Sequence, residues 1–217
     1  MIGKLLPPPV SVAEAFQDPP GLPLFGAEPD EISRAVPKRR REFTTVRWCA
    51  RQALAGLGHG PVPILRGERG APVWPDGIVG SMTHCDGYRA AAVAHASEVR
   101  GIGLDAETHQ PLPDGVLDLI ALPAEQRHIA ELSGTDPEVH WDRLLFSIKE
   151  SVYKAWFPLT RRWLGHEQAE ITMAFDGTFA ARILEADPRV PAEGFTGRWA
   201  TDRERGLVVS VITVPLG

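Results

Sequence analysis

Two carboxylates within residues 103–107 (Gly-Leu-Asp-Ala-Glu) have a spacing that could hold a metal ion. Side chains alternate faces along an extended strand, so Asp105 and Glu107 are expected to point the same way. Carboxylates this close repel each other unless a positive charge lies between them. A hard divalent cation such as Mg²⁺ accepts carboxylate ligands and phosphate oxygens together. The alternative is a strand face that is simply solvated.

A third carboxylate and a lysine occur within residues 149–154 (Lys-Glu-Ser-Val-Tyr-Lys). Glu150 and Lys154 are one helical turn apart and lie away from the apolar stripe of this segment. As a surface ion pair they would contribute about 0.2–0.5 kcal/mol to stability. As functional groups, Glu150 would be a third metal ligand or a base, and Lys154 would bind phosphate.

Basic residues are concentrated between Arg34 and Arg51, where seven arginines and lysines accompany one acid, Glu42. Arginine forms fork-like hydrogen bonds with phosphate, so this density suits a phosphate-rich ligand. A solvated helix face or a nucleic-acid patch would have the same composition. A further candidate is His84, which ends the segment Gly-Ser-Met-Thr-His and could equally be a satisfied residue at a strand end.

The composition of the whole chain excludes several classes. Its 217 residues are 43% hydrophobic and carry a net charge of −5, which is too apolar for a disordered chain and too acidic for a general nucleic-acid binder. No run approaches the roughly 20 apolar residues that span a bilayer. The two cysteines, Cys49 and Cys85, form neither a disulfide framework nor a zinc motif. With no recognisable export signal, we expect a cytoplasmic location and neither a membrane nor a nucleic-acid partner.

The spacing of apolar residues and the positions of turn residues indicate which helices and strands carry these candidate residues. Apolar residues at three- and four-residue steps predict helices over residues 36–57 and 139–157. Turn signals at 86–87 and 176–177 predict hairpins over 77–94 and 170–184, and apolar runs predict strands at 100–107 and 207–214. The proline-rich residues 1–30 are expected to form an irregular arm.

The order of helix, hairpin and strand therefore occurs twice. This favours an α+β fold of two similar halves, residues 1–108 and 109–217, with a cleft between them. In this division the first half holds the arm, the basic helix, the first sheet and the strand with Asp105. The second half holds the helix with Glu150 and the second sheet.

Together, these segments resemble the Sfp-type 4′-phosphopantetheinyl transferases, and the actinobacterial members in particular. The family pattern is S-x-[ST]-H, then G-[IL]-D-x-E, then K-E-[SA]-x-[YF]-K. Residues 81–84, 103–107 and 149–154 match it in this order. The resemblance covers about residues 37–171, including the basic helix and the stretch 157–165 (Phe-Pro-Leu-Thr-Arg-Arg-Trp-Leu-Gly).

The resemblance implies a pseudo-twofold pair of α+β halves with the active site in the cleft. It also implies transfer of the phosphopantetheine arm of coenzyme A to a serine of an apo acyl or peptidyl carrier protein, with release of adenosine 3′,5′-bisphosphate. The reaction would depend on Mg²⁺, for which Mn²⁺ could substitute. The carriers would belong to fatty-acid, polyketide or nonribosomal-peptide synthases. The two-halved fold makes a monomer the expected state.

The resemblance assigns roles to individual residues as well. Asp105, Glu107 and Glu150 would coordinate the metal, and Glu150 is the first candidate for the general base. Lys154 and His84 would be catalytic and contact the phosphates of coenzyme A. Further contacts with coenzyme A would come from basic and hydroxyl side chains: Arg39, Arg40, Arg47, Arg51, Arg66, Arg69, Ser81 and Thr83.

The carrier-docking surface has two candidates in the sequence. The stretch from Arg161 to Leu164 offers two cations and two apolar groups, which could steer and anchor an acidic carrier helix. The apolar segment from Leu112 to Leu122 is an equal rival. Two other functions also fit the same residues. One is a metal-dependent pyrophosphohydrolase of nucleotides that resemble coenzyme A, and the other is a non-enzymatic regulator that binds coenzyme A.

Overall fold

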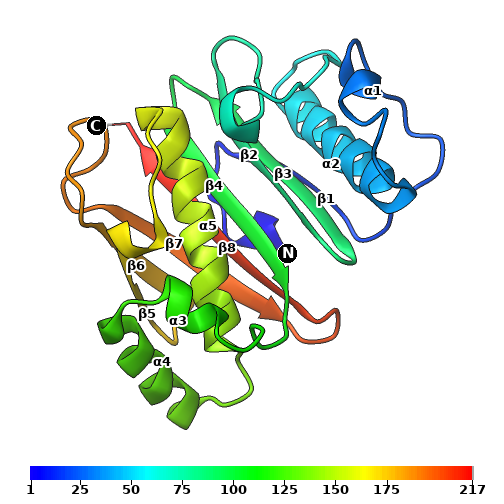
Figure 1. The fold of residues 1–217 in the computed structure, drawn as a ribbon. Coiled ribbons are helices and arrows are strands. Elements are labelled where there is room, and N and C mark those ends of the chain that lie inside the picture. Colours follow the sequence, from blue (N-terminus) through cyan, green and yellow to red (C-terminus); the bar gives the residue numbers. More distant parts are fainter. Residues whose placement is uncertain (217) are drawn as a thin grey trace.

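Each half of the chain places one long helix against an antiparallel sheet (Figure 1). The structure is a computed structural model that describes residues 1–216. In the first half, the sheet has the strand order β1-β3-β2. Its strands are β1 (Ser11–Ala15), β2 (Ile78–Cys85) and β3 (Tyr88–His95), and α2 (Pro37–Gly56) covers one face. A short α1 (Glu28–Glu31) precedes this helix.

The second half contains a five-stranded sheet of order β4-β8-β7-β6-β5. Its core is one cluster of buried apolar side chains between the sheet and α5 (Trp141–Thr160). The strands are β4 (Val99–Thr108), β5 (Ala169–Met173), β6 (Thr178–Ile183), β7 (Phe195–Asp202) and β8 (Leu207–Pro215). The helices α3 (Val116–Ile120) and α4 (Pro123–Thr135) lie at one end of α5 (Figure 1).

The predicted α+β class with two halves is confirmed, as are both long helices and both hairpins. The prediction of an irregular N-terminal arm is wrong in part. Residues Ser11–Ala15 form β1 and pair with β3, from Ser11 opposite Val93 to Ala15 opposite Arg89. The segment Ser-Val-Ala-Glu-Ala has no apolar alternation that would reveal a strand, because all five residues are half-buried. The strand β7 and the helix α4 were not predicted.

The strand with Asp105 differs from its predicted assignment. The sequence placed it in the first half, whereas β4 pairs along its length with β8 and belongs to the second sheet. The reason is that β8 is the last strand of the chain, and a pairing across that separation has no local signal. The strand therefore connects the two halves and does not end the first.

The two halves meet where β2 lies beside β4. No backbone ladder joins these two strands within residues 1–216. Instead, the backbone N–H groups of Leu104 and Ala106 donate to the hydroxyls of Ser81 and Thr83, both at 3.1 Å. These hydroxyls satisfy buried donors of a strand edge, which would otherwise cost about 1–3 kcal/mol each. Ser81 and Thr83 thus join the halves.

The helix α5 lies unusually close to β4. A Cβ atom built on Gly103 would come within 2.0 Å of the carbonyl oxygen of Ser151. Glycine at this position is therefore needed for the helix to pack at this distance. The close approach brings Lys154 of α5 within reach of Asp105 of β4. Within residues 1–216 no helix is long and apolar enough to cross a membrane.

Candidate active site

A cavity of about 740 Å³ lies between the two halves. The helix α2 and the strand β2 of the first half line it, as do β4 and α5 of the second half. One wall is acidic and contains Asp105, Glu107 and Glu150. A second group of lining residues, here called the basic wall, comes from α2 and the loop after it and consists of Arg39, Arg47, Arg66 and Arg69, with one acid, Glu68, beside them.

Asp105 is the most enclosed carboxylate of the acidic wall, with 4% of its surface exposed. Its Oδ1 accepts from Lys154 Nζ at 2.7 Å and from the Thr83 hydroxyl at 3.3 Å. Its Oδ2 is buried and has no hydrogen-bond partner among residues 1–216. Burial raises the pKa of Asp105, and the Lys154 ammonium opposes that rise. A buried carboxylate oxygen without a donor is a position where a cation would be favourable.

Glu107, two residues further along β4, also lines the cavity. Burial and the negative charge of Asp105 raise the pKa of Glu107 to about 7. Its Oε2 accepts from Arg143 Nη1 of α5 at 3.2 Å, which opposes the rise. This raised pKa reflects the mutual repulsion that the sequence predicted for the pair.

Glu150 and Lys154 project from α5 into the cavity. The Lys154 ammonium donates to Asp105 and to the carbonyl oxygen of Leu104 at 3.1 Å. Glu150 accepts from Nε2 of His166 at 3.5 Å, and this contact is the largest cause of the lowered pKa of Glu150. A surface ion pair between Glu150 and Lys154 is not formed, because Lys154 turns to the strand.

His84 lies at the end of β2 between charged groups of both signs. Its Nε2 accepts a hydrogen bond from Arg39 Nη1, and Glu42 lies 3.7 Å away. Burial and the neighbouring charge of Arg39 lower the pKa of His84 to about 4. His84 is therefore neutral near pH 7 and lines the cavity as a hydrogen-bonding group.

Four of the arginines that are expected to bind coenzyme A line the cavity, and each is held by different contacts. Arg47 is buried, donates from Nε to the carbonyl of Ile64 at 3.0 Å, and stacks over Phe43. Arg66 stacks over the same ring from a loop. Arg39 binds His84 and Arg69 lies 5.4 Å above the Trp163 ring.

Two proposed arginines do not line the cavity. Arg51 is buried against Glu28, with Nη1 at 2.8 Å from Oε1, and also donates to the carbonyl of Pro23. Arg40 donates to the backbone carbonyls of Ser33 and Ala35. The structure thus gives both residues a role in holding residues 23–35 onto α2 and does not bring them to the cavity.

The capacity of the acidic wall to hold a metal ion depends on its donor atoms. No group of three or more histidine, cysteine, aspartate or glutamate side chains within residues 1–216 is already gathered around one point. The donor set is nevertheless suitable, because three carboxylates line one cavity and Asp105 Oδ2 accepts from no donor in the described part of the chain. Mg²⁺ is bound through one or two carboxylates plus substrate phosphates, so a complete protein cage is not required.

Several residues of this site were missed by the sequence reasoning. Arg143 reaches Glu107 from one turn inside α5, and His166 reaches Glu150 from a 3-10 turn (His166–Gln168). Neither residue carried a local signal. Tyr153 lines the cavity, and its buried hydroxyl has no hydrogen-bond partner within the described residues. Tyr153 follows Glu150 by three residues, and this helical spacing could have indicated it.

The fold has two α+β halves, and three carboxylates and several arginines surround the cavity between them. The same assignment follows when the sequence is compared with models of known protein families. Residues 27–94 match the model of the 4′-phosphopantetheinyl transferase N-terminal domain, and residues 101–210 match that of the 4′-phosphopantetheinyl transferase superfamily. The chain therefore belongs to the 4′-phosphopantetheinyl transferase superfamily, and its enzyme class is that of these transferases.

Individual relatives extend this similarity over nearly the full length. The chain is 53% identical over 221 residues to 4′-phosphopantetheinyl transferase Svp of Streptomyces mobaraensis, covering 99% of this chain and 89% of that protein. It is 49% identical over 227 residues to 4′-phosphopantetheinyl transferase PptT of Mycobacterium tuberculosis, covering 99% and 98%. Enterobactin synthase component D of Salmonella typhi is 35% identical over 170 residues, covering 76% and 68%. The predicted resemblance to the actinobacterial enzymes is confirmed.

Proposed function

We propose that this transferase moves the 4′-phosphopantetheine group from coenzyme A to a serine of apo acyl or peptidyl carrier proteins of fatty-acid, polyketide or nonribosomal-peptide synthases. The observation that carries the proposal is the cavity itself, which is lined by three carboxylates on β4 and α5 and by arginines on α2 and on the loop of residues 66–70. A pyrophosphate with an adenosine 3′-phosphate suits a cavity with both kinds of group. The arginines suit the phosphates, and the carboxylates suit a bridging cation.

The reaction forms a bond from the serine Oγ to the β-phosphorus of coenzyme A. The bond from that phosphorus to the bridging oxygen breaks, and adenosine 3′,5′-bisphosphate leaves with the electron pair. The serine proton passes to a base. Such phosphoryl transfer depends mainly on positioning and on neutralising charge. Lys154 provides a positive group at the acidic wall, where its ammonium already holds Asp105.

Asp105, Glu107 and Glu150 are the proposed ligands of Mg²⁺, or of Mn²⁺ in its place. When bound, this cation supplies positive charge to the pyrophosphate oxygens. Glu150 is also the proposed proton acceptor, directly or through a water molecule. Its lowered pKa makes it a weak base, so positioning must contribute much of its effect. His84, neutral near pH 7, is proposed to donate or accept a hydrogen bond with the phosphates.

The basic wall is proposed to hold the adenosine phosphates. Arg47 is the best supported residue, because the Ile64 carbonyl and the Phe43 ring fix its guanidinium at the cavity. Arg39, Arg66 and Arg69 also line the cavity. Arg40 and Arg51 are no longer proposed as contacts, since neither lines the cavity and their donors bind residues 23–35. Ser81 and Thr83 contribute through the junction of β2 with β4.

The carrier protein is proposed to dock beside the cavity entrance at Trp163. This side chain is 58% exposed and lies between Arg69 and Tyr153, both of which line the cavity. A cationic and aromatic rim suits an acidic carrier helix. Leu164 is buried and Arg162 binds Asp187, so the docking role narrows to Trp163 and Arg161. The other candidate docking segment, residues 112–122, contains Leu119, which is 82% exposed. This segment does not line the cavity.

The release of adenosine 3′,5′-bisphosphate, measured with and without an apo carrier, tests the transferase against the hydrolase. The transferase predicts release only when the carrier is present. Release at the same rate without a carrier would establish the hydrolase instead. Binding of coenzyme A that needs neither metal nor acidic wall, with no release, would favour the regulator. A cytoplasmic location and a monomeric state stay predictions from the sequence.

A further inference from the structure

His166 contacts Glu150 and is not among the described residues that line the cavity. Its Nε2 is 3.5 Å from Oε1 of Glu150, and since a carboxylate can only accept, the imidazole N–H donates. Glu150 itself does line the cavity. His166 can therefore influence the reacting groups only through Glu150, which makes it a positioning residue.

The backbone of His166 is fixed by the neighbour of Glu150 on α5. The Lys149 ammonium donates to the carbonyl oxygens of His166 at 2.7 Å and Ala169 at 3.0 Å. It also pairs with Glu125 at 2.9 Å, and both side chains are 1% exposed. A buried pair with its remaining donors satisfied has little freedom to move. Two successive residues of α5 thus hold His166, one by its backbone and one by its ring.

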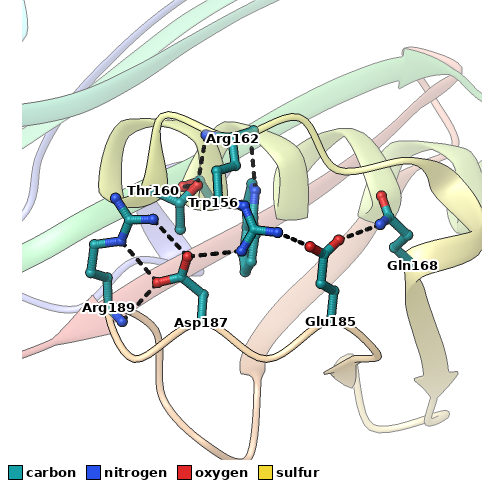
Figure 2. A network of polar contacts seen from close by, with 7 residues as sticks. All are labelled: Trp156, Thr160, Arg162, Gln168, Glu185, Asp187 and Arg189. Carbon is teal, nitrogen blue, oxygen red and sulfur yellow. Dashed lines mark hydrogen bonds and ion pairs between the residues drawn. The ribbon is translucent and has the colours of Figure 1, made fainter.

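Both ends of residues 162–168 are also fixed, as Figure 2 shows. At one end, Trp156 Nε1 donates to the Arg162 carbonyl at 3.0 Å, and the Arg162 guanidinium binds Asp187 and Glu185. At the other end, the Gln168 amide also binds Glu185. Residues 162 and 168 are thereby joined through one glutamate (Figure 2). The segment that carries His166 is therefore held at both ends and in its middle.

We propose that His166 fixes the orientation of the Glu150 carboxylate toward the divalent cation, an inference that rests on the proposed function. A glutamate has three rotatable side-chain bonds, and without a donor it samples several rotamers. Partners that orient a metal-binding carboxylate typically change metal affinity or activity by 10–100-fold. We expect the lower end of this range, because both side chains are about one third exposed, 36% and 33%.

Two variants separate the donor from the ring. His166→Phe removes the N–H donor and keeps an aromatic ring beside Phe146, whose centroid is 6.3 Å from that of His166. His166→Gln keeps an N–H donor without the ring. The matched control is His59→Phe, because His59 packs on His95 outside the cavity lining.

The first readout is Mn²⁺ binding by electron paramagnetic resonance, with coenzyme A present and no carrier, so it does not depend on turnover. His166→Phe is expected to weaken Mn²⁺ binding about tenfold, His166→Gln less than threefold, and His59→Phe not measurably. The second readout is transfer kinetics, where the half-saturating Mg²⁺ concentration should rise while the KM for the carrier stays unchanged.

Wild-type Mn²⁺ affinity in a folded His166→Phe variant would overturn the proposal. Equal weakening in His166→Phe and His166→Gln would overturn it too, because the donor would then be irrelevant. If His166→Phe lowers the unfolding midpoint, His166→Leu, which also lacks a donor, replaces it in the comparison. Failure of the wild-type protein to transfer at any metal concentration would contradict the proposed function. The role of His166 fails separately, when the wild type transfers but His166→Phe keeps its Mn²⁺ affinity.

Discussion

Replacing Glu107 by glutamine is expected to stabilise the folded protein while removing one of the three proposed metal ligands. Burial and the charge of Asp105 raise the pKa of Glu107 from an ordinary 4.5 to about 7. The folded protein thus holds this proton more tightly than the unfolded chain, and ionisation above pH 7 opposes folding. Each pKa unit corresponds to about 1.36 kcal/mol, which gives about 3 kcal/mol in total. Discounted for the 23% of the side chain that is exposed, the cost is about 2 kcal/mol.

The stability difference between Glu107→Gln and the wild type depends on pH, because the pKa of Glu107 is higher in the folded protein than in the unfolded chain. Below about pH 4.5 the carboxyl is protonated in both states, so Glu107→Gln should match the wild type. Between about pH 4.5 and 7 the wild type progressively loses stability relative to the variant, and above pH 7 the difference is complete. For a chain of this length, about 2 kcal/mol raises the unfolding midpoint by about 4–8 °C.

The assay is thermal unfolding of both proteins at pH 8 and at pH 4.5, with and without Mg²⁺ and coenzyme A. The ligands should raise the midpoint of the wild type more than that of Glu107→Gln, since the variant lacks one ligand. Glu138→Gln is the matched control, because Glu138 is exposed and its ion pair with Arg203 should contribute little. A Glu107→Gln variant no more stable than the wild type at pH 8 would contradict the cost assigned to the Glu107 charge, and an equal response of both proteins to the ligands would contradict the proposed metal-binding role of Glu107.

Three further predictions follow from the same structure. Asp105→Ala and Glu150→Ala should each abolish transfer while far-UV circular dichroism stays unchanged; a wild-type rate in either would contradict the assignment. Arg51→Met should lower the free energy of unfolding by about 3–5 kcal/mol, because it leaves Glu28 buried without its partner, whereas Arg40→Ala, measured in the same denaturant series, should change it by less than about 1 kcal/mol. Because burial and Arg39 lower the pKa of His84 to about 4 in the protein without coenzyme A, the imidazole NMR signals of His84 should not titrate between pH 6 and 8 in that state; a titration within this range, absent from His84→Gln, would contradict the prediction.

The acidic wall could be predicted from the sequence because its signals are local. Alternation along β4 indicated that Asp105 and Glu107 share a face, and one helical turn related Glu150 to Lys154. Both pairs line the same cavity. The two segments are linked in space by Gly103, whose lack of a Cβ lets α5 approach β4.

The basic wall could not be resolved in the same way. Arg47 and Arg51 are one turn apart on α2, so periodicity does not distinguish them. They differ because Glu28 lies beside Arg51, and that pairing depends on how residues 23–31 pack. A charged side chain is directed by its partner, and a partner distant in sequence leaves no local pattern.

The strand assignments failed for a related reason. The strand β1 is a half-buried edge strand, and β7 contains Gly197, which breaks the apolar alternation. A Cβ at Gly197 would lie 2.2 Å from the Phe179 ring, so glycine is required by a neighbour on β6. The pairing of β4 with β8 likewise depends on residues about a hundred positions away.

The central claim is most directly tested by the intact mass of an apo carrier protein after incubation with this protein, coenzyme A and Mg²⁺. A parallel sample contains EDTA, and both an acyl and a peptidyl carrier are used. We expect a gain of one phosphopantetheinyl group on at least one carrier, and no gain with EDTA. Unmodified carriers of both types in the presence of Mg²⁺, with coenzyme A cleaved or intact, would contradict it.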